Sequence, residues 1–148
     1  MAAAAKGFEP SRSRTKIILV YGLFIALFCG INDLLMQQHQ MKLATEPYNN
    51  IATGKKVIES RLFDEKRQQI AIGDQIVFSE NDNPENSVTT TVKGLLRYQT
   101  FKELFADHDP ALFGEKSRDF LLTQIKQFYP DEDEQKYGVV GIRLELLG

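Results

Sequence analysis

The residues best suited to chemistry lie in one short stretch, 54–63, which reads Gly-Lys-Lys-Val-Ile-Glu-Ser-Arg-Leu-Phe. This stretch predicts a tight turn followed by a strand, in which successive side chains alternate between two faces. Glu59 and Arg61 then share one face, and Lys55 and Lys56 reach it from the turn. A carboxylate can accept a hydrogen bond from an amino group or transfer a proton, while neighbouring cations can hold a phosphate or polarise a carbonyl.

The same residues have a simpler interpretation, an exposed ion pair between Glu59 and Arg61 at the mouth of a barrel. Such pairs are common and contribute about 0–1 kcal/mol to stability. Tyr98, in a later predicted strand, is a second candidate because a base stacked on an aromatic ring gains roughly 1–3 kcal/mol. The alternative for Tyr98 is a buried tyrosine that only packs.

The sequence contains no pattern that predicts a metal site or a cofactor. Cys29 is the only cysteine, and His39 and His108 are the only histidines. Zinc sites need about four such ligands at suitable spacing. The four consecutive acids of 131–134 cannot converge on one ion from a single face, so we expect a solvated helix start there.

Strands are expected on both sides of the candidate site. A short extended segment at 41–43 comes first, and the strand of 54–63 follows. Later strands are predicted from the apolar alternation at 70–78, from the β-branched run 88–98 with a bulge at Gly94, and from the alternation at 140–147.

Two helices are predicted from their capping residues, and two shorter helical turns flank them. Thr100 and Glu103 form a capping box for a helix that begins at Phe101. A longer helix runs from Ser117 to Phe128. Its apolar stripe predicts a face packed into the core and consists of Phe120, Leu121, Gln124, Ile125 and Phe128. Helical turns are expected at 47–52, ended by Gly54, and from residue 131. Together these elements predict an α+β domain of about five strands in a small barrel with two or three helices.

The N-terminal segment, 1–35, is treated separately because its residues 17–31 carry no charge. With the apolar residues that follow, this run approaches the ~20 residues that span a bilayer. One interpretation is a membrane anchor, with the remainder of the chain as a tethered interaction domain. The other is a mis-assigned start, with translation from Met36 or Met41 and a cytoplasmic protein. We expect the globular domain to occupy 36–148.

Charge limits the partners of that domain. The chain has 18 basic and 20 acidic residues, and the part after residue 35 carries 14 basic and 18 acidic residues, a net charge of −4. Proteins that bind nucleic acid by bulk electrostatics present basic faces. Any recognition of RNA must therefore depend on a local patch.

The order of these motifs resembles the ASCH family, which has a PUA-like β-barrel. The resemblance covers about 41–147 and has four parts. These are the stretch Gly54 to Arg61, the strand entry Ile72-Gly73-Asp74 with Ile76 and Phe78, Tyr98 before the Thr100-Phe101 helix start, and Tyr129-Pro130 followed by 137–142. The resemblance implies a PUA-like barrel and an RNA-binding or RNA-modifying module.

Some members of this family remove the acetyl group from acetylcytidine nucleosides. In those enzymes a lysine at the position of Lys56 is followed three residues later by a nucleophilic threonine. This chain has Glu59 at that third position, which argues against the threonine mechanism. The enzymes also use a glutamate before the long helix, for which Glu115 is the nearest match.

Three functional hypotheses result. The first is a module that binds RNA, a nucleoside or a nucleotide in a cleft lined by Lys56, Glu59 and Arg61, with Lys55 and Tyr98 as further candidate binding residues. The second is an enzyme on the same scaffold, an amidohydrolase of a modified nucleoside or a ribonuclease. In it Lys56 would position and polarise the substrate, and Glu59 would activate water. The third is the membrane-tethered interaction domain.

Overall fold

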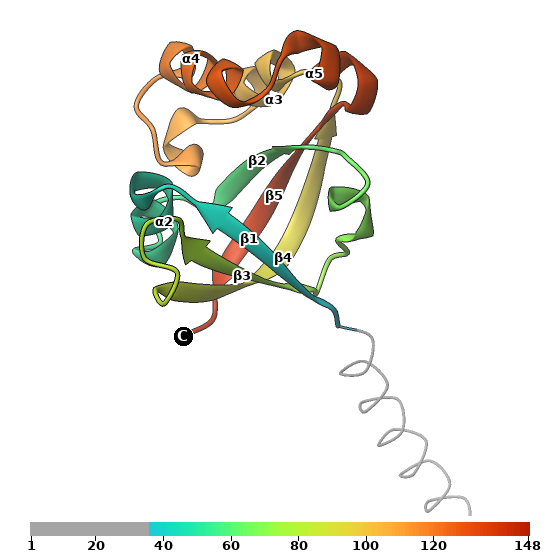
Figure 1. The fold of residues 1–148 in the computed structure, drawn as a ribbon. Helices are drawn as coiled ribbons and strands as arrows, with labels where there is room; N and C mark the ends of the chain where they lie inside the picture. Colours follow the sequence, from blue (N-terminus) through green and yellow to red (C-terminus); the bar gives the residue numbers. More distant parts are fainter. Residues whose placement is uncertain (1–35) are drawn as a thin grey trace, which may run out of the picture. The chain divides into compact units, whose positions relative to one another are not determined.

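A single mixed sheet of five strands curls into a half-barrel in the computed structural model, which describes residues 36–148 (Figure 1). The strands are β1 Gln38–Leu43, β2 Ile58–Leu62, β3 Gln75–Glu80, β4 Ser87–Tyr98 and β5 Val139–Leu146. Their order is β1-β3-β4-β5-β2, with β1 parallel to β3 and the other neighbours antiparallel. The predicted α+β class, the number of strands and the PUA-like barrel are confirmed.

Strand β1 begins three residues before the predicted extended segment, at Gln38. Asp74 explains this extension, because its carboxylate accepts hydrogen bonds from the backbone of Gln37 at 3.0 Å and of Ala71 at 2.9 Å. The same carboxylate lies 2.8 Å from Nε2 of His39. The Gly73-Asp74 turn therefore holds the start of β1 beside β3.

The predicted bulge in β4 is present, as a register shift between Val92 and Gly94 in the pairing with β5. Glycine is favoured there because a Cβ at position 94 would lie 3.3 Å from Cδ of Arg143. The bulge bends the longest strand of the sheet, as curling into a half-barrel requires.

Four α-helices are present in residues 36–148, against the two or three predicted. They are α2 Thr45–Ala52, α3 Phe101–Asp107, α4 Arg118–Phe128 and α5 Asp131–Tyr137, with two 3-10 helices, η1 Arg67–Gln69 and η2 Pro110–Phe113. The sequence predicted α2 and α5 only as helical turns, because each is short. The capping box of Thr100 and Glu103 on α3 is confirmed, and Ser117 caps α4 through a bond from Phe120 N.

Two apolar clusters lie on the two faces of the sheet. The barrel core fills the concave side and includes Met41, Tyr48, Ile76, Phe78 and Ile142. The helix-side core lies under α3 and α4 and includes Ile58, Phe101, Leu104, Phe105 and Phe113. Figure 1 shows α3, α4 and α5 grouped together on one side of the sheet, with α2 beside β1 and β3.

The prediction that the whole stripe of α4 packs into the core is wrong. Among its residues only Leu121 is buried, whereas Phe120 is 46% and Phe128 70% exposed. Leu121 and Ile125 pack against the helix-side core, whereas the two phenylalanines at the ends of the stripe are largely exposed.

The predicted hydrophobic segment 1–35 lies outside the described residues. Within residues 36–148, no helix has the length and apolar character needed to cross a membrane.

Candidate functional site

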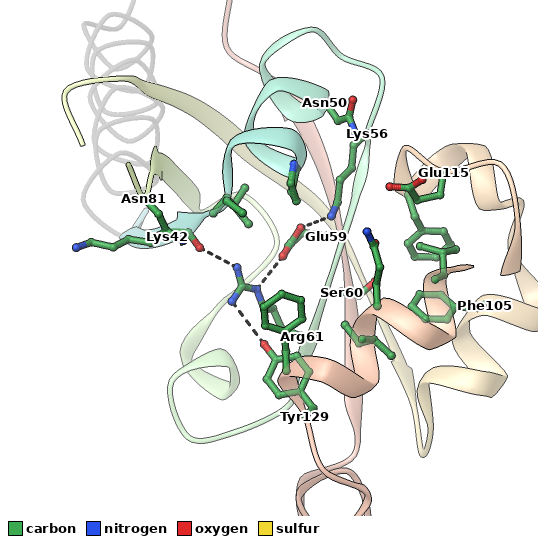
Figure 2. A pocket seen from close by; sticks show the side chains of 18 residues that line it. Lys42, Asn50, Lys56, Glu59, Ser60, Arg61, Asn81, Phe105, Glu115 and Tyr129 are labelled. Atoms are coloured by element: carbon green, nitrogen blue, oxygen red, sulfur yellow. Dashed lines mark hydrogen bonds and ion pairs between the residues drawn. The ribbon is translucent and has the colours of Figure 1, made fainter. Parts of the chain in front are cut away.

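A cavity of about 270 Å³ lies where the two edge strands, β1 and β2, face α4 (Figure 2). Polar groups occupy its β2 side and apolar groups its α4 side. Its lining includes residues of β1, β2, α3, α4 and the segments beside them, among them Lys42, Lys56, Glu59, Ser60, Arg61, Phe105, Phe113, Glu115, Leu121, Gln124, Ile125, Phe128 and Tyr129. The cavity therefore contains the candidate residues Lys56, Glu59 and Arg61.

Glu59 lies between two cations. Its Oε1 accepts from Nε of Arg61 at 2.8 Å, and its Oε2 lies 2.7 Å from Nζ of Lys56. The period-two alternation of β2 explains the first contact, because Glu59 and Arg61 face the same way opposite Ile142 and Val140 of β5. The predicted proximity of these residues is confirmed.

This cluster is buried, unlike the exposed ion pair of the simpler interpretation. The side chains of Lys56, Glu59 and Arg61 are 14%, 5% and 16% exposed. Breaking a buried pair by removing one partner costs several kcal/mol, because it leaves an uncompensated charge in a poorly solvated place. The cluster is therefore an organised feature rather than a solvated surface contact.

Opposing effects set the pKa of Glu59. Burial raises it, but the positive charges of Lys56 and Arg61, both in close contact with the carboxylate, outweigh burial, so the pKa of Glu59 lies below its ordinary value. Desolvation opposes the charged form of Arg61, yet the facing carboxylate holds the pKa of Arg61 above its ordinary range. Glu59 is thus an ionised hydrogen-bond acceptor at neutral pH.

One oxygen of this carboxylate lacks a directional donor. Nζ of Lys56 lies within ion-pair distance of Oε2, but the approach angle falls outside hydrogen-bond geometry, so Oε2 is buried without a hydrogen-bond partner within residues 36–148. Charge attraction alone accounts for that contact. Buried polar atoms are nearly always hydrogen-bonded, and exceptions call for an explanation.

Arg61 also connects the two edges of the half-barrel. Its Nη2 donates to the backbone carbonyl of Lys42 on β1 at 3.2 Å, and its Nη1 donates to Oη of Tyr129 at 3.5 Å (Figure 2). The Tyr129 ring stacks on Phe101 of α3, with centroids 5.6 Å apart. The guanidinium is therefore held by groups from β1, β2 and the end of α4.

Lys56 is fixed by the turn that follows α2. Its backbone N–H donates to Asn50 O at 2.8 Å. Gly114 passes close to it, since a Cβ at position 114 would lie 3.2 Å from Cβ of Lys56, and its φ of +85° also favours glycine. This close approach brings the next residue, Glu115, into the lining of the same cavity.

Two other candidates lie elsewhere. Lys55 is exposed and is absent from the lining of the cavity. Tyr98 packs against the helix-side core, and its hydroxyl lies 3.1 Å from Nε2 of His108. The cavity thus brings together three of the five predicted binding residues.

Several cavity residues carried no functional signal in the sequence. The carbonyl of Lys42 and the hydroxyl of Tyr129 contribute through the fold alone. The wall formed by α4 did leave a signal, an amphipathic stripe ending in an exposed phenylalanine, which we assigned to the core. No group of three or more histidine, cysteine, aspartate or glutamate side chains within residues 36–148 could hold a metal ion.

The fold and site define a PUA-like half-barrel with a charged cavity at the open side of its sheet. The family model of the ASCH domain matches residues 41–148, and the chain belongs to this family. The ASCH domain is a PUA-like fold family proposed to bind RNA. The predicted family is confirmed.

Several solved structures are similar to this chain. The crystal structure of hypothetical protein PH0355 is 38% identical, with a TM-score of 0.67, and the match covers 75% of this chain and 100% of that one. The solution structure of protein PF0455 from Pyrococcus furiosus is 35% identical, with a TM-score of 0.61 and coverage of 75% and 98%. An ASCH protein from Zymomonas mobilis is 14% identical, with a TM-score of 0.46 and coverage of 74% and 67%. No curated protein matches the chain.

Proposed function

We propose that this ASCH domain binds RNA, a nucleoside or a nucleotide. Glu59 accepts a hydrogen bond from the exocyclic amino group of a base, such as cytosine or adenine. The observation that carries the proposal is the Glu59 carboxylate, which lines the cavity in its ionised form and whose Oε2 is paired with Lys56 without a well-directed hydrogen bond. An amino N–H of the ligand can supply that hydrogen bond. A carbonyl at the same place, as in uracil, would bring two acceptors together.

The charges of the cavity balance, although the domain as a whole is acidic. Lys56 and Arg61 provide two positive charges, and Glu59 and Glu115 provide two negative charges. The side chain of Lys42 is exposed and points away from the cavity, which it lines through its backbone (Figure 2). Binding in this manner depends on a local patch, not on bulk attraction.

Calorimetric titration of the protein with cytidine, adenosine and uridine tests the proposal. Hydrogen bonds to charged groups contribute about 1.5–3 kcal/mol. We therefore expect cytidine and adenosine to bind at least about tenfold more tightly than uridine. Replacing Lys56 by Ala should weaken cytidine binding, because Lys56 helps to hold the Glu59 carboxylate in place.

The matched control is Lys93→Ala. Lys93 also pairs with a glutamate, Glu145 at 2.9 Å, but both side chains are more than half exposed and neither lines the cavity. Its variant should bind cytidine as the unmodified protein does. Equal weak binding of all three nucleosides, or equal behaviour of Lys56→Ala and Lys93→Ala, would refute the proposal.

Glu115 favours a second candidate, hydrolysis of the acetyl amide of a modified cytidine. Figure 2 shows Glu115 on the side of the cavity facing Lys56. In this reaction water attacks the amide carbonyl while Glu115 takes its proton, the C–N bond breaks, acetate leaves and the proton passes to the amine. Lys56 would polarise the carbonyl. Glu59 is a poor base, because two cations stabilise its ionised form and lower its pKa.

Release of acetate from acetylcytidine tests this second candidate. Turnover that is lost in Glu115→Gln while acetylcytidine still binds would establish it. Binding of cytidine without turnover of acetylcytidine would reject it and leave the binding function in place.

A further inference from the structure

The apolar side of the cavity is one continuous face of α4. Its lining residues Leu121, Gln124, Ile125 and Phe128 occupy positions i, i+3, i+4 and i+7, which lie on one side of a helix. Leu121 and Ile125 also pack on the helix-side core. The face continues along an open cavity whose opposite side holds the Glu59 carboxylate.

Phe128 differs from the other residues of this face in its exposure. Its side chain is 70% exposed although it lines the cavity, whereas Leu121 is buried. A single exposed apolar residue needs no explanation by itself. This one lies at the rim of a cavity with a buried carboxylate, immediately before Tyr129, whose hydroxyl is 3.5 Å from Arg61.

A ligand that touches both sides of the cavity needs two different properties. It needs an N–H donor at one edge for Oε2 of Glu59, and a flat apolar surface for the aromatic rim. A nucleobase combines them, because its edge carries donors and its faces are π-surfaces. An aliphatic amine has the donor but no face to stack.

We propose that Phe128 stacks on the face of the bound base, the same base whose amino group donates a hydrogen bond to Glu59. The inference depends on the proposed binding function and adds the residue that holds the base in place. Stacking needs an uncovered face, so the bound form is a free nucleoside or an unpaired base of single-stranded RNA. In a duplex both faces are covered by neighbouring bases.

Ring-current shifts offer a direct measurement. Protons of a base that lies over an aromatic ring move upfield in the proton NMR spectrum. We expect H5 and H6 of cytidine to shift upfield on binding the protein, and to lose a large part of that shift in Phe128→Leu, which keeps apolar bulk but removes the ring. Because stacking is worth roughly 1–3 kcal/mol per base, cytidine should bind about 5- to 150-fold more weakly to this variant.

Two further variants serve as controls. Phe128→Tyr keeps an aromatic ring and should restore both the shift and the affinity. Phe120→Leu removes a second phenylalanine of α4, 46% exposed and absent from the lining of the cavity, and should change neither. Both phenylalanines are exposed, so neither substitution removes a core residue, and urea denaturation of each variant checks that it is folded.

Each result decides one question. Cytidine binding with the same affinity and the same shifts in Phe128→Leu would overturn the stacking role and leave the binding function standing. Absence of cytidine and adenosine binding to the unmodified protein would overturn the binding function, and the stacking role with it. If Phe120→Leu weakens cytidine binding as much as Phe128→Leu does, the stacking role is also overturned, because the effect would not depend on the cavity.

Discussion

Glu59 shows how burial changes the meaning of a residue. On an exposed strand, a glutamate two positions from an arginine contributes little and suggests no function. In this domain the carboxylate is almost inaccessible, is held by Lys56 and Arg61, and keeps one oxygen without a hydrogen-bond donor. The same pair of residues becomes a rigid acceptor at the side of a cavity.

The lowered pKa of Glu59 predicts a pH dependence of stability. As pH falls below the ordinary value of 4.5, the unfolded chain takes up a proton before the folded protein does. The stabilisation by Glu59 is therefore complete above that value and is lost as pH falls through the lowered pKa. Urea denaturation of the protein and of Glu59→Gln, from about pH 7 down to about pH 3, measures this contribution.

We expect Glu59→Gln to be less stable by about 3–5 kcal/mol at neutral pH, because Lys56 and Arg61 lose their buried partner. The difference should shrink as pH falls below 4.5 and through the lowered pKa of Glu59, because the carboxylate then becomes neutral as well. Asp74, whose pKa is also lowered, is present in both proteins and cancels in the comparison. A difference that stays constant with pH would contradict this account.

At the scale of elements, α3 and α4 form the side of the cavity opposite β1 and β2. Helix α3 approaches the sheet closely because β5 has glycine at position 141, where a Cβ would lie 3.0 Å from Cδ1 of Leu104. Two backbone N–H groups in its first turn have side-chain acceptors. Glu103 N donates to the Thr100 hydroxyl, and Phe101 N donates to the carboxylate of Glu134 on α5 at 2.9 Å. Helix α5 thus ties the chain after α4 to the start of α3.

The capping box on α3 gives a prediction about this element. Thr100→Ala removes the acceptor for Glu103 N, and we expect a loss of about 0.5–2 kcal/mol in the free energy of unfolding. Thr123→Ala is the control, because that hydroxyl donates to Asp119 O in the middle of α4 and caps nothing. Urea denaturation of both variants compares them, and equal stability would show that the box adds nothing.

At the scale of the whole domain, the half-barrel leaves β1 and β2 as its two edges. Arg61 of β2 donates to the carbonyl of Lys42 on β1, so the same side chain closes the open side and holds Glu59. The cavity therefore depends on β1, the first strand of the domain. We propose that the domain begins at residue 36, where β1 keeps its full length.

Truncation tests this boundary. A variant that begins at Met41 lacks the register pairs of Gln38, His39 and Gln40 with β3 and the contacts of Asp74 with Gln37 and His39. We expect it to be less stable than a variant that begins at Met36 by about 2–4 kcal/mol, since each lost hydrogen bond is worth about 0.5–1.5 kcal/mol. Equal stability in urea would place the start of the folded domain at or after Met41.

The local structure of this protein and its family could be predicted from the amino-acid sequence. Strand alternation placed Glu59 and Arg61 on one face, Thr100 with Glu103 marked a helix start, and Gly94 marked a bulge. These features depend on residues close together in the chain, so patterns and capping preferences predict them. The order of the motifs then pointed to the ASCH family.

The exposure of each residue, and the contacts between residues far apart in the chain, could not be predicted and follow from the tertiary fold. It buried the Glu59 cluster, brought Glu115 and Tyr129 to the same cavity, and left Phe128 at the rim instead of in the core. An amphipathic stripe shows that a helix has an apolar face, but it does not show whether that face meets another element or an open cavity. That outcome depends on how β1 and β2 end the half-barrel opposite α4, a relation between parts far apart in the sequence.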